Sequence, residues 1–427
     1  MTWRTDLHSL DGPFRSLREP GRWLWAAALV GFALRVHFAV FTPGTLDVVV
    51  WDGHAQEIAE RGLIAYYHGG RFTFNHPPLS GLLVTGLWNL AQTTPFSFAF
   101  LLRAPFALLD AGTALLLVTW LAGARNESLR RGRFVIGALY WLSPLAIVYS
   151  AHHGNTDSAV AFFLVAAALF ASREHAIACG FALGLGLWVK IPGILVAPLL
   201  FMALPSWRAR MQLVVTTTAT ALVGYLPWLV QDSEVIVRAV FLYPGLLIRT
   251  PGGTPIWGMQ VFYPAFRSLS DGPHEVIRAF TSAWYAWNTL VCLVPIVAWS
   301  WMRRGRRTPE DLAMGIAGVY VILYGLSNFW AFQYLAWSLP FWLVCGLPFA
   351  ISATLVATAY VYGLYAWLCG DWLMRGEWRF IALPDWPMPI LLARNVAVVF
   401  FFVTALLWLA KQTREEIGRW RANSDVR

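Results

Sequence analysis

Long apolar stretches separated by short polar segments run through almost the whole chain of 427 residues. A helix needs about 20 apolar residues to cross the roughly 30 Å of hydrocarbon in a bilayer. The stretches therefore predict an all-α membrane protein of about twelve transmembrane helices. These are residues 23–41, 98–121, 134–150, 158–171, 177–189, 194–204, 213–230, one helix between 278 and 303, 313–326, 335–347, 351–368 and 390–409.

Arginine and lysine in the short polar segments set the orientation, because loops rich in these residues stay in the cytoplasm. This rule predicts one polytopic domain over 1–427 with a cytoplasmic tail at each end, 1–22 and 411–427. It leaves 42–97 and 232–278 as outer loops. Only one span fits between the first outer loop and the basic segment 125–133. The apolar segment 78–90 is therefore predicted to be a juxtamembrane helix in the outer interface.

The composition supports a protein embedded in lipid. Hydrophobic residues make up 58% of the chain and charged residues only 13%, whereas soluble domains carry about 25% charged residues. The net charge of +9 is spread over short loops. It therefore does not form the basic patch of a nucleic-acid-binding protein, and we expect no nucleic-acid partner. The four cysteines show neither metal-ligand spacing nor a disulfide framework.

Two carboxylates follow the first apolar stretch. Asp47 and Asp52 lie in the predicted outer loop, and His76 follows in the segment Asn75-His-Pro-Pro. A carboxylate just outside the bilayer can act as general base toward a hydroxyl of a substrate. Asp47 is the first choice for that role, with Asp52 and His76 as substrate-binding residues. Two alternatives stay open: Asp52 is the base, or Asp47 merely caps a helix.

A second polar segment, 150–158, joins two apolar stretches and contains His152, His153, Asn155 and Asp157. One interpretation is a tight turn whose polar side chains cap the next helix. Two histidines and an acid at membrane depth favour a substrate-binding loop instead. Two imidazoles and a carboxylate are also compatible with a divalent metal. We expect no metal to be required.

Several cations fall on the outer side in this topology. Lys190 ends an apolar stretch before Pro192-Gly193, and its ammonium could simply reach the interface. With other outward cations it could also bind the phosphate of a substrate. The predicted phosphate-binding residues are Lys190, Arg103, Arg249 and Arg267.

Two further polar residues lie within apolar surroundings. Asp110 falls inside the second span, where we favour a structural hydrogen bond to a neighbouring helix. The aromatic segment 328–337 is typical of an interface belt. Gln333 in this segment is a candidate for binding a sugar.

Four local motifs occur in a recognisable order. They are Asp47 followed by Pro77-Pro78-Leu79, His153-Gly154-Asn-Thr-Asp157, Lys190 with Pro198, and Gln333-Tyr-Leu-Ala-Trp-Ser-Leu-Pro340. Together they resemble the polytopic glycosyltransferases of the GT-C class that use polyprenyl-phosphate sugars. The match is to the dolichyl-phosphate-glucose glucosyltransferase branch and its bacterial relatives. The chain carries Asp157 where the eukaryotic enzymes of that branch carry Gln.

The resemblance implies a GT-C-like bundle and a hexosyltransferase. Such an enzyme moves one sugar from a polyprenyl-phosphate donor to a hydroxyl of a lipid-linked glycan, a polysaccharide or another acceptor. Transfer inverts the sugar, with Asp47 as base, on the periplasmic face of a bacterial inner membrane or the lumenal face in a eukaryote. The implied partners are the sugar donor, the acceptor and the lipid bilayer. No cofactor is implied, although a divalent metal stays compatible.

Two other classes of protein remain open. A secondary transporter or a flippase of lipid-linked glycans would place acids or broken helices near the midplane in both halves of the chain. A structural or assembly subunit without chemistry of its own would tolerate the loss of the Asp47 carboxylate. The polar residues gather on the predicted outer face and only Asp110 lies deep, which favours the enzyme.

Overall fold

The computed structural model describes residues 21–70, 73–242, 279, 283, 284, 286–327, 331–379 and 386–424. Within these ranges every regular element is helical, which confirms the all-α prediction. The first half contains α1 (Arg22–Phe41), α2 (Leu46–Arg61), α3 (Leu63–Gly69), α4 (Pro78–Thr93), α5 (Phe98–Leu121), α6 (Glu127–Trp141), α7 (Pro144–Ile147), the π-helix η3 (Val148–His153), α8 (Asp157–Ser172), α9 (Ala176–Val189) and the 3₁₀-helix η4 (Ile191–Val196).

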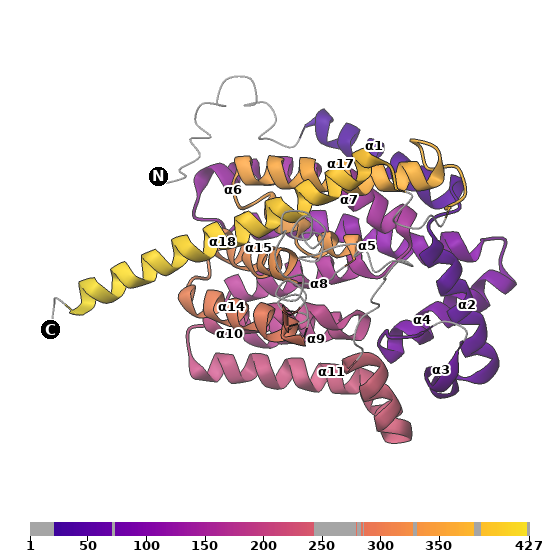
Figure 1. The fold of residues 1–427 in the computed structure, drawn as a ribbon, viewed down its shortest axis with the longest axis horizontal. Helices are drawn as coiled ribbons and strands as arrows, with labels where there is room; N and C mark the ends of the chain where they lie inside the picture. Colours follow the sequence, from indigo (N-terminus) through magenta and orange to yellow (C-terminus); the bar gives the residue numbers. More distant parts are fainter. Residues whose placement is uncertain are drawn as a thin grey trace.

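The second half continues the same all-helical pattern. It contains α10 (Ala197–Ala203), α11 (Trp207–Ile236), the π-helix η5 (Val237–Phe241), α14 (Asn288–Met302), α15 (Pro309–Leu326), the 3₁₀-helix η7 (Phe332–Trp337), α16 (Leu339–Trp342), α17 (Leu347–Cys369) and α18 (Met388–Ser424). Most of the long helices run roughly side by side in one bundle (Figure 1).

Six described helices are long and apolar enough to cross a membrane, and a seventh span results if the bent α6–α7–η3 segment counts as one. Four shorter apolar elements lie among them. A multi-pass integral membrane protein is therefore supported, whereas the predicted total of twelve spans is not confirmed. The prediction for 98–121 coincides with α5, because Ser97 caps its start by accepting from the amide of Phe100.

Two predicted spans are not continuous helices. The stretch 134–150 bends by 47° where α6 ends before Pro144, because proline interrupts the hydrogen-bond ladder of a helix. The stretch 335–347 folds as the end of η7, the single turn α16 and a turn at Gly346, whose φ is +118°. Hydropathy alone could not have located either break, because both broken segments are still apolar.

Helices α2, α3 and α4 form a group at one end of the bundle, and the last turns of α18 project at the opposite end (Figure 1). The predicted juxtamembrane segment 78–90 is indeed helical, as α4, and it is not among the candidate spans. The sides of the membrane assigned to the loops and tails stay predictions. The tail residues 1–20, the outer-loop residues 243–278 and Asn328 lie outside the described residues.

Helix α8 forms part of the core and begins at Asp157. Its alanines at 159, 161, 166, 167 and 168 are buried, and such small residues let neighbouring helices approach closely. Asp157 is therefore carried into the interior by the first turn of a buried helix. The apolar core around α8 includes residues of α5, α15 and α17.

A buried ion pair joins α1 to α5. Arg35 Nη2 lies 2.8 Å from Asp110 Oδ2, and the hydroxyl of Tyr140 in α6 donates to Asp110 Oδ1 at 2.9 Å. Arg35 also donates to the carbonyl of Trp141 at 2.8 Å. The geometry agrees with the structural role favoured for Asp110, because both oxygens of its carboxylate are bound by other helices.

Candidate functional site

The polar segment 150–158 folds as the end of a π-helix followed by a sharp turn. Helix η3 ends at His153 and is capped by Gly154, whose φ of +70° and ψ of +43° lie in the left-handed region. Glycine adopts this conformation without the steric cost that other residues meet. The turn connects η3 to α8, so that His153 and Asn155 both lie just before the start of α8.

The start of α2 is tied to this turn. Thr45 caps α2 by accepting from the amide of Asp47, and its hydroxyl donates to the carbonyl of His153 at 2.9 Å. The cap of the helix is therefore Thr45, and the alternative that Asp47 is the capping residue is wrong. The same contacts bring the first turn of α2 against a segment more than 100 residues later in the chain.

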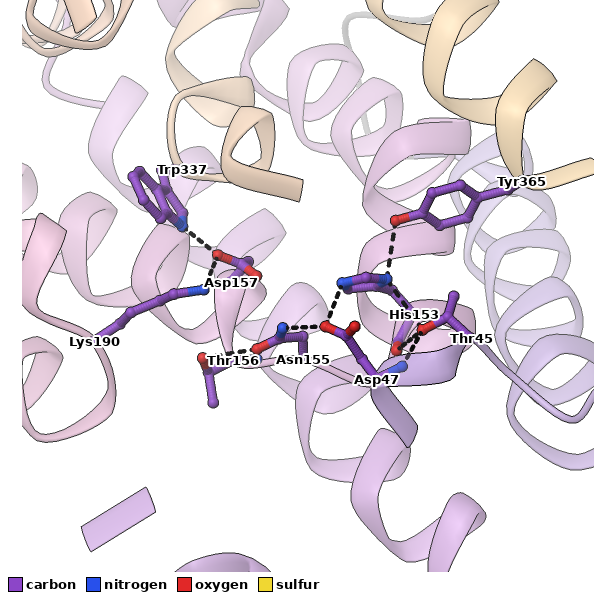
Figure 2. Close-up of polar contacts among 9 residues, drawn as sticks. All are labelled: Thr45, Asp47, His153, Asn155, Thr156, Asp157, Lys190, Trp337 and Tyr365. Carbon is purple, nitrogen blue, oxygen red and sulfur yellow. Dashed lines mark hydrogen bonds and ion pairs between the residues drawn. The ribbon is translucent and has the colours of Figure 1, made fainter. Parts of the chain in front are cut away.

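Asp47 makes two side-chain contacts in the turn. Asn155 Nδ2 donates to Asp47 Oδ2 at 2.6 Å, and His153 Nε2 lies 3.2 Å from the same oxygen. The other ring nitrogen of His153, Nδ1, lies 2.9 Å from the hydroxyl of Tyr365 in α17. Asn155, Asp47, His153 and Tyr365 thus form one continuous polar chain (Figure 2).

The surroundings of Asp47 favour its ionised form. Burial raises the pKa of this carboxyl, but the charge of His153, the hydrogen bonds from His153 and Asn155 and the charge of Lys190 outweigh burial and lower the pKa to about 2. About a third of the side chain, 36%, is nevertheless exposed. Asp47 is therefore a stable anion that remains accessible.

A second network lies beside the first. Asp157 Oδ1 is 2.8 Å from Lys190 Nζ and accepts from Trp337 Nε1 at 2.6 Å. Lys190 follows α9 in an extended conformation just before Pro192. Its ammonium lies 5.0 Å from the ring of Tyr334 and 5.6 Å from that of Trp337. These two rings stack on each other at 4.2 Å.

The two networks converge. Asn155 belongs to the first and Asp157 to the second, only two residues apart (Figure 2). The charge of Lys190 also reaches Asp47, because it contributes to lowering the pKa of Asp47. We call these joined networks the polar site: Asp47, His153, Asn155, Asp157, Lys190, Trp337 and Tyr365.

Three other predicted substrate-binding residues have different surroundings. His76 is partly buried with its ring 4.3 Å from that of Trp51, and burial, followed by the charge of Lys190, holds its pKa well below 6.5. Gln333 lies in η7 between Phe332 and Tyr334. Asp52 lies on the exposed face of α2, turned away from buried Trp51.

Arg103 and His152 are engaged inside the bundle. Arg103 is 1% exposed and donates to the carbonyls of Ala99, Phe38 and Thr42 at 2.7 to 3.0 Å. These contacts tie α5 to the end of α1 and favour a structural role for Arg103, so phosphate binding there stays only a prediction. His152 Nδ1 lies 3.0 Å from Thr42 Oγ1. Arg249 and Arg267 lie outside the described residues.

The metal alternative finds no support in the described part of the chain. No three His, Cys, Asp or Glu side chains there come together as ligands. His152 faces Thr42, His153 faces Asp47 and Tyr365, and Asp157 faces Lys190. The three residues considered as metal ligands therefore point to different partners.

The sequence analysis missed two aromatic residues of the site, Trp337 and Tyr365, and their neighbour Tyr334. Trp337 and Tyr334 belong to a segment that was interpreted as an interface belt, yet Trp337 is 1% exposed and bonded to Asp157. Tyr365 lies in the apolar helix α17, where no local pattern distinguishes it from a core residue. The only available signal was the motif around Gln333, which includes both Tyr334 and Trp337.

The fold and the site define a polytopic, all-helical membrane protein with a polar site where α2 and η7 meet the start of α8. Residues 56–242, less than half of the chain, match the model of a protein family described as GPI transamidase subunit PIG-U. The matched segment includes His76, His153, Asn155, Asp157 and Lys190, but not Asp47. No curated protein matches the chain.

This match overturns the expected activity. The family is described as a subunit of a transamidase, which is neither a sugar-transferring enzyme nor a flippase. The expectation of a hexosyltransferase is therefore wrong, and so is the alternative of a transporter or flippase. The specific resemblance to the dolichyl-phosphate-glucose branch also gains no support. The sequence analysis also left open a subunit without chemistry of its own, and the match does not contradict that alternative.

Proposed function

We propose that this chain is a membrane-embedded subunit of a complex that attaches a lipid to protein. In this proposal the polar site binds the head group of the lipid-linked substrate and does not transform it. The catalytic centre belongs to another subunit of the assembly. The chain contributes binding and placement of the lipid in the bilayer.

The observation that carries the proposal is the match of residues 56–242 to a family described as a GPI transamidase subunit. That segment contains four of the seven residues of the polar site, which are His153, Asn155, Asp157 and Lys190. The matched range therefore contains part of the site as well as apolar helices, whereas Asp47, Trp337 and Tyr365 lie outside it.

The geometry supports binding over chemistry. An efficient general base has a pKa near the working pH, whereas the pKa of Asp47 is lowered to about 2. A carboxylate of this kind accepts hydrogen bonds well but removes protons poorly. Lys190 is already paired with Asp157 at 2.8 Å, so its charge is largely balanced within the protein.

The test compares the chain alone with the chain in its native assembly. The tagged chain is extracted from its own membranes in a mild detergent, and the complex is assayed for joining a lipid-linked amine to a peptide with release of the peptide's C-terminal fragment. We expect this activity in the complex and none in the chain purified alone. In addition, Asp157→Asn should reduce the activity of the complex without dissociating it, whereas Asp371→Asn, a carboxylate outside the polar site, should not.

Two results would overturn the proposal. One is a chain that is monomeric in its native membranes, with no transamidation in any fraction that contains it. The other is sugar transfer by the chain purified alone from a polyprenyl-phosphate sugar, abolished by Asp47→Asn. The first outcome would show that the chain is not part of such a complex. The second would show that it is an enzyme in its own right and not a binding subunit.

A further inference from the structure

The polar site and the adjoining helix η7 each contain a buried oxygen atom that has no hydrogen-bond partner among the described residues. Asp157 places Oδ1 between Lys190 and Trp337, but its Oδ2 has no partner among the described residues, although the side chain is only 1% exposed. The buried Oε1 of Gln333 also has none in the described chain. Buried polar atoms are almost always hydrogen-bonded, so such exceptions call for an explanation, and a bound ligand would supply one.

Helix η7 links these two oxygens. Trp337 at its end donates to Asp157, Tyr334 lies beside Lys190, and the ring of Phe332 at its start is 6.2 Å from that of His153. Gln333 occupies the turn between Phe332 and Tyr334. Its position in η7 therefore places it in the segment that borders both halves of the polar site.

Both unpartnered atoms are acceptors. A carboxylate oxygen and an amide oxygen are completed only by a ligand that donates hydrogen bonds. A phosphate group that has lost its protons offers none. It would also approach Lys190 next to the carboxylates of Asp157 and Asp47, which repel an anion. The site therefore does not have the excess of positive charge that phosphate binding needs.

We infer that Asp157 Oδ2 and Gln333 Oε1 form a subsite for hydrogen-bond donors of a glycolipid head group, either sugar hydroxyls or a protonated amine, and not for its phosphate. This inference rests on the proposed function and names the chemistry of the head group. Lys190 then acts as a positioning residue: it holds Oδ1 of Asp157, while Oδ2 makes no contact with the other residues drawn in Figure 2.

The experiment measures which lipids stay bound to the chain in nanodiscs by native mass spectrometry. Three lipids with identical acyl chains are compared: glucosyl-diacylglycerol, glucosaminyl-diacylglycerol and phosphatidic acid. We expect wild type to retain the two glycolipids about tenfold more strongly than phosphatidic acid. A preference between the two glycolipids tells whether a hydroxyl or the amine is the main donor, and either supports the subsite.

The variants assign the preference to the two oxygens. Asp157→Asn replaces an acceptor by a donor, so glycolipid retention should fall about tenfold. Gln333→Leu removes the other acceptor without changing charge and should give a smaller loss in the same direction. Asp371→Asn makes the same chemical change as Asp157→Asn at a carboxylate that pairs with Arg375 elsewhere, and it should change nothing.

Failure of the inference and failure of the proposed function give different results. If wild type prefers phosphatidic acid and Lys190→Gln removes that preference, the subsite binds phosphate and the inference is wrong, while a lipid-binding subunit remains. If retention is the same for all three lipids and for plain diacylglycerol, the site binds no head group and the proposed function fails. Gln333→Leu keeps the test decisive if Asp157→Asn does not fold.

Discussion

Two buried carboxylates of this protein have almost the same exposure and very different surroundings. Asp110 and Asp157 are both fully buried, and each lies 2.8 Å from a cation. Asp110 uses both oxygens, one for Arg35 and one for Tyr140. Oδ1 of Asp157 contacts both Lys190 and Trp337, whereas Oδ2 has no partner in the described chain. Asp110 thus joins α5 to α1 and α6 through both of its oxygens, whereas Asp157 keeps one oxygen that our proposal assigns to a ligand.

The sharpest test of this comparison is the same substitution at both positions. Asp110→Asn leaves Arg35 buried without a counter-charge, so the free energy of unfolding should fall by about 3–5 kcal/mol. Asp157→Asn should cost only about 1–2 kcal/mol, because Lys190 still has the charge of Asp47 nearby. Thermal unfolding in one detergent measures both. Equal losses would remove the distinction between a structural and a ligand-binding carboxylate.

The second prediction uses pH, because neutral histidines border the polar site. Burial lowers the pKa of His54 to about 4, although the charge of Asp47 acts in the opposite direction. In the unfolded chain this histidine is protonated near pH 6.5, so the unfolded state binds more protons between pH 6.5 and 4. The part of the free energy of unfolding that is linked to His54 is therefore fully present above pH 6.5, and it should fall by up to about 3 kcal/mol as the pH approaches 4.

Unfolding measured across pH 4–7 checks this prediction. His54→Gln should flatten part of the curve, and His76→Gln should flatten it further, since the pKa of His76 is also held well below 6.5. Asp47 does not contribute in this window. Its pKa is lowered from 3.8 to about 2, so the stability it adds is present above pH 3.8 and is lost only below that value. An unchanged slope in both variants would contradict the assignment.

Much of the apolar architecture could be predicted from the sequence, whereas the site could be predicted only in part. The bounds of α5 follow from an apolar stretch with a capping serine before it. Five residues of the site stood out in the sequence because polar residues at membrane depth need partners. They are Asp47, His153, Asn155, Asp157 and Lys190. Their pairing was not visible, since it depends on a turn that brings α2 against η3.

The remaining features could not be predicted, because they depend on contacts between residues that are far apart in the sequence or on properties that hydropathy does not record. Hydropathy cannot separate the broken segment around η7 and α16 from a continuous span, because both are apolar. The motif resemblance pointed to sugar transfer, but similar polar loops serve different functions on related folds. Tyr365 joins the site from a helix more than 200 residues after His153, and no local pattern records such a contact.

A third prediction concerns the turn at Gly154, which lies between His153 and Asp157. Gly154→Ala should lower the free energy of unfolding by about 1–3 kcal/mol. A methyl group there would meet left-handed backbone and the stiff side chain of Val48 at 2.7 Å. Gly305→Ala is the matched control, since Gly305 has a similar φ of +73° with open space around it. A loss no larger than that of the control would show that the turn has room to spare.

The smallest effect is expected at the far end of the bundle. Arg306 pairs with Glu415 of α18 at 3.4 Å, and both side chains are substantially exposed. Exposed pairs contribute below about 1 kcal/mol, so Arg306→Gln should barely change thermal unfolding and should not affect lipid retention. A larger loss of stability than that caused by Asp157→Asn would contradict the small contribution expected for an exposed ion pair.

The π-helical winding of η3 makes the length of this short element decisive. A π-helix typically differs from an α-helix by one extra residue within the turn, and each residue rotates a helix by about 100°. Deleting a single residue from 148–153 would therefore swing the imidazole of His153 away from Asp47 while leaving the hydropathy of the span unchanged. Side chains within η3 can therefore be replaced without moving His153, whereas a deletion of one residue would change the partners of His153.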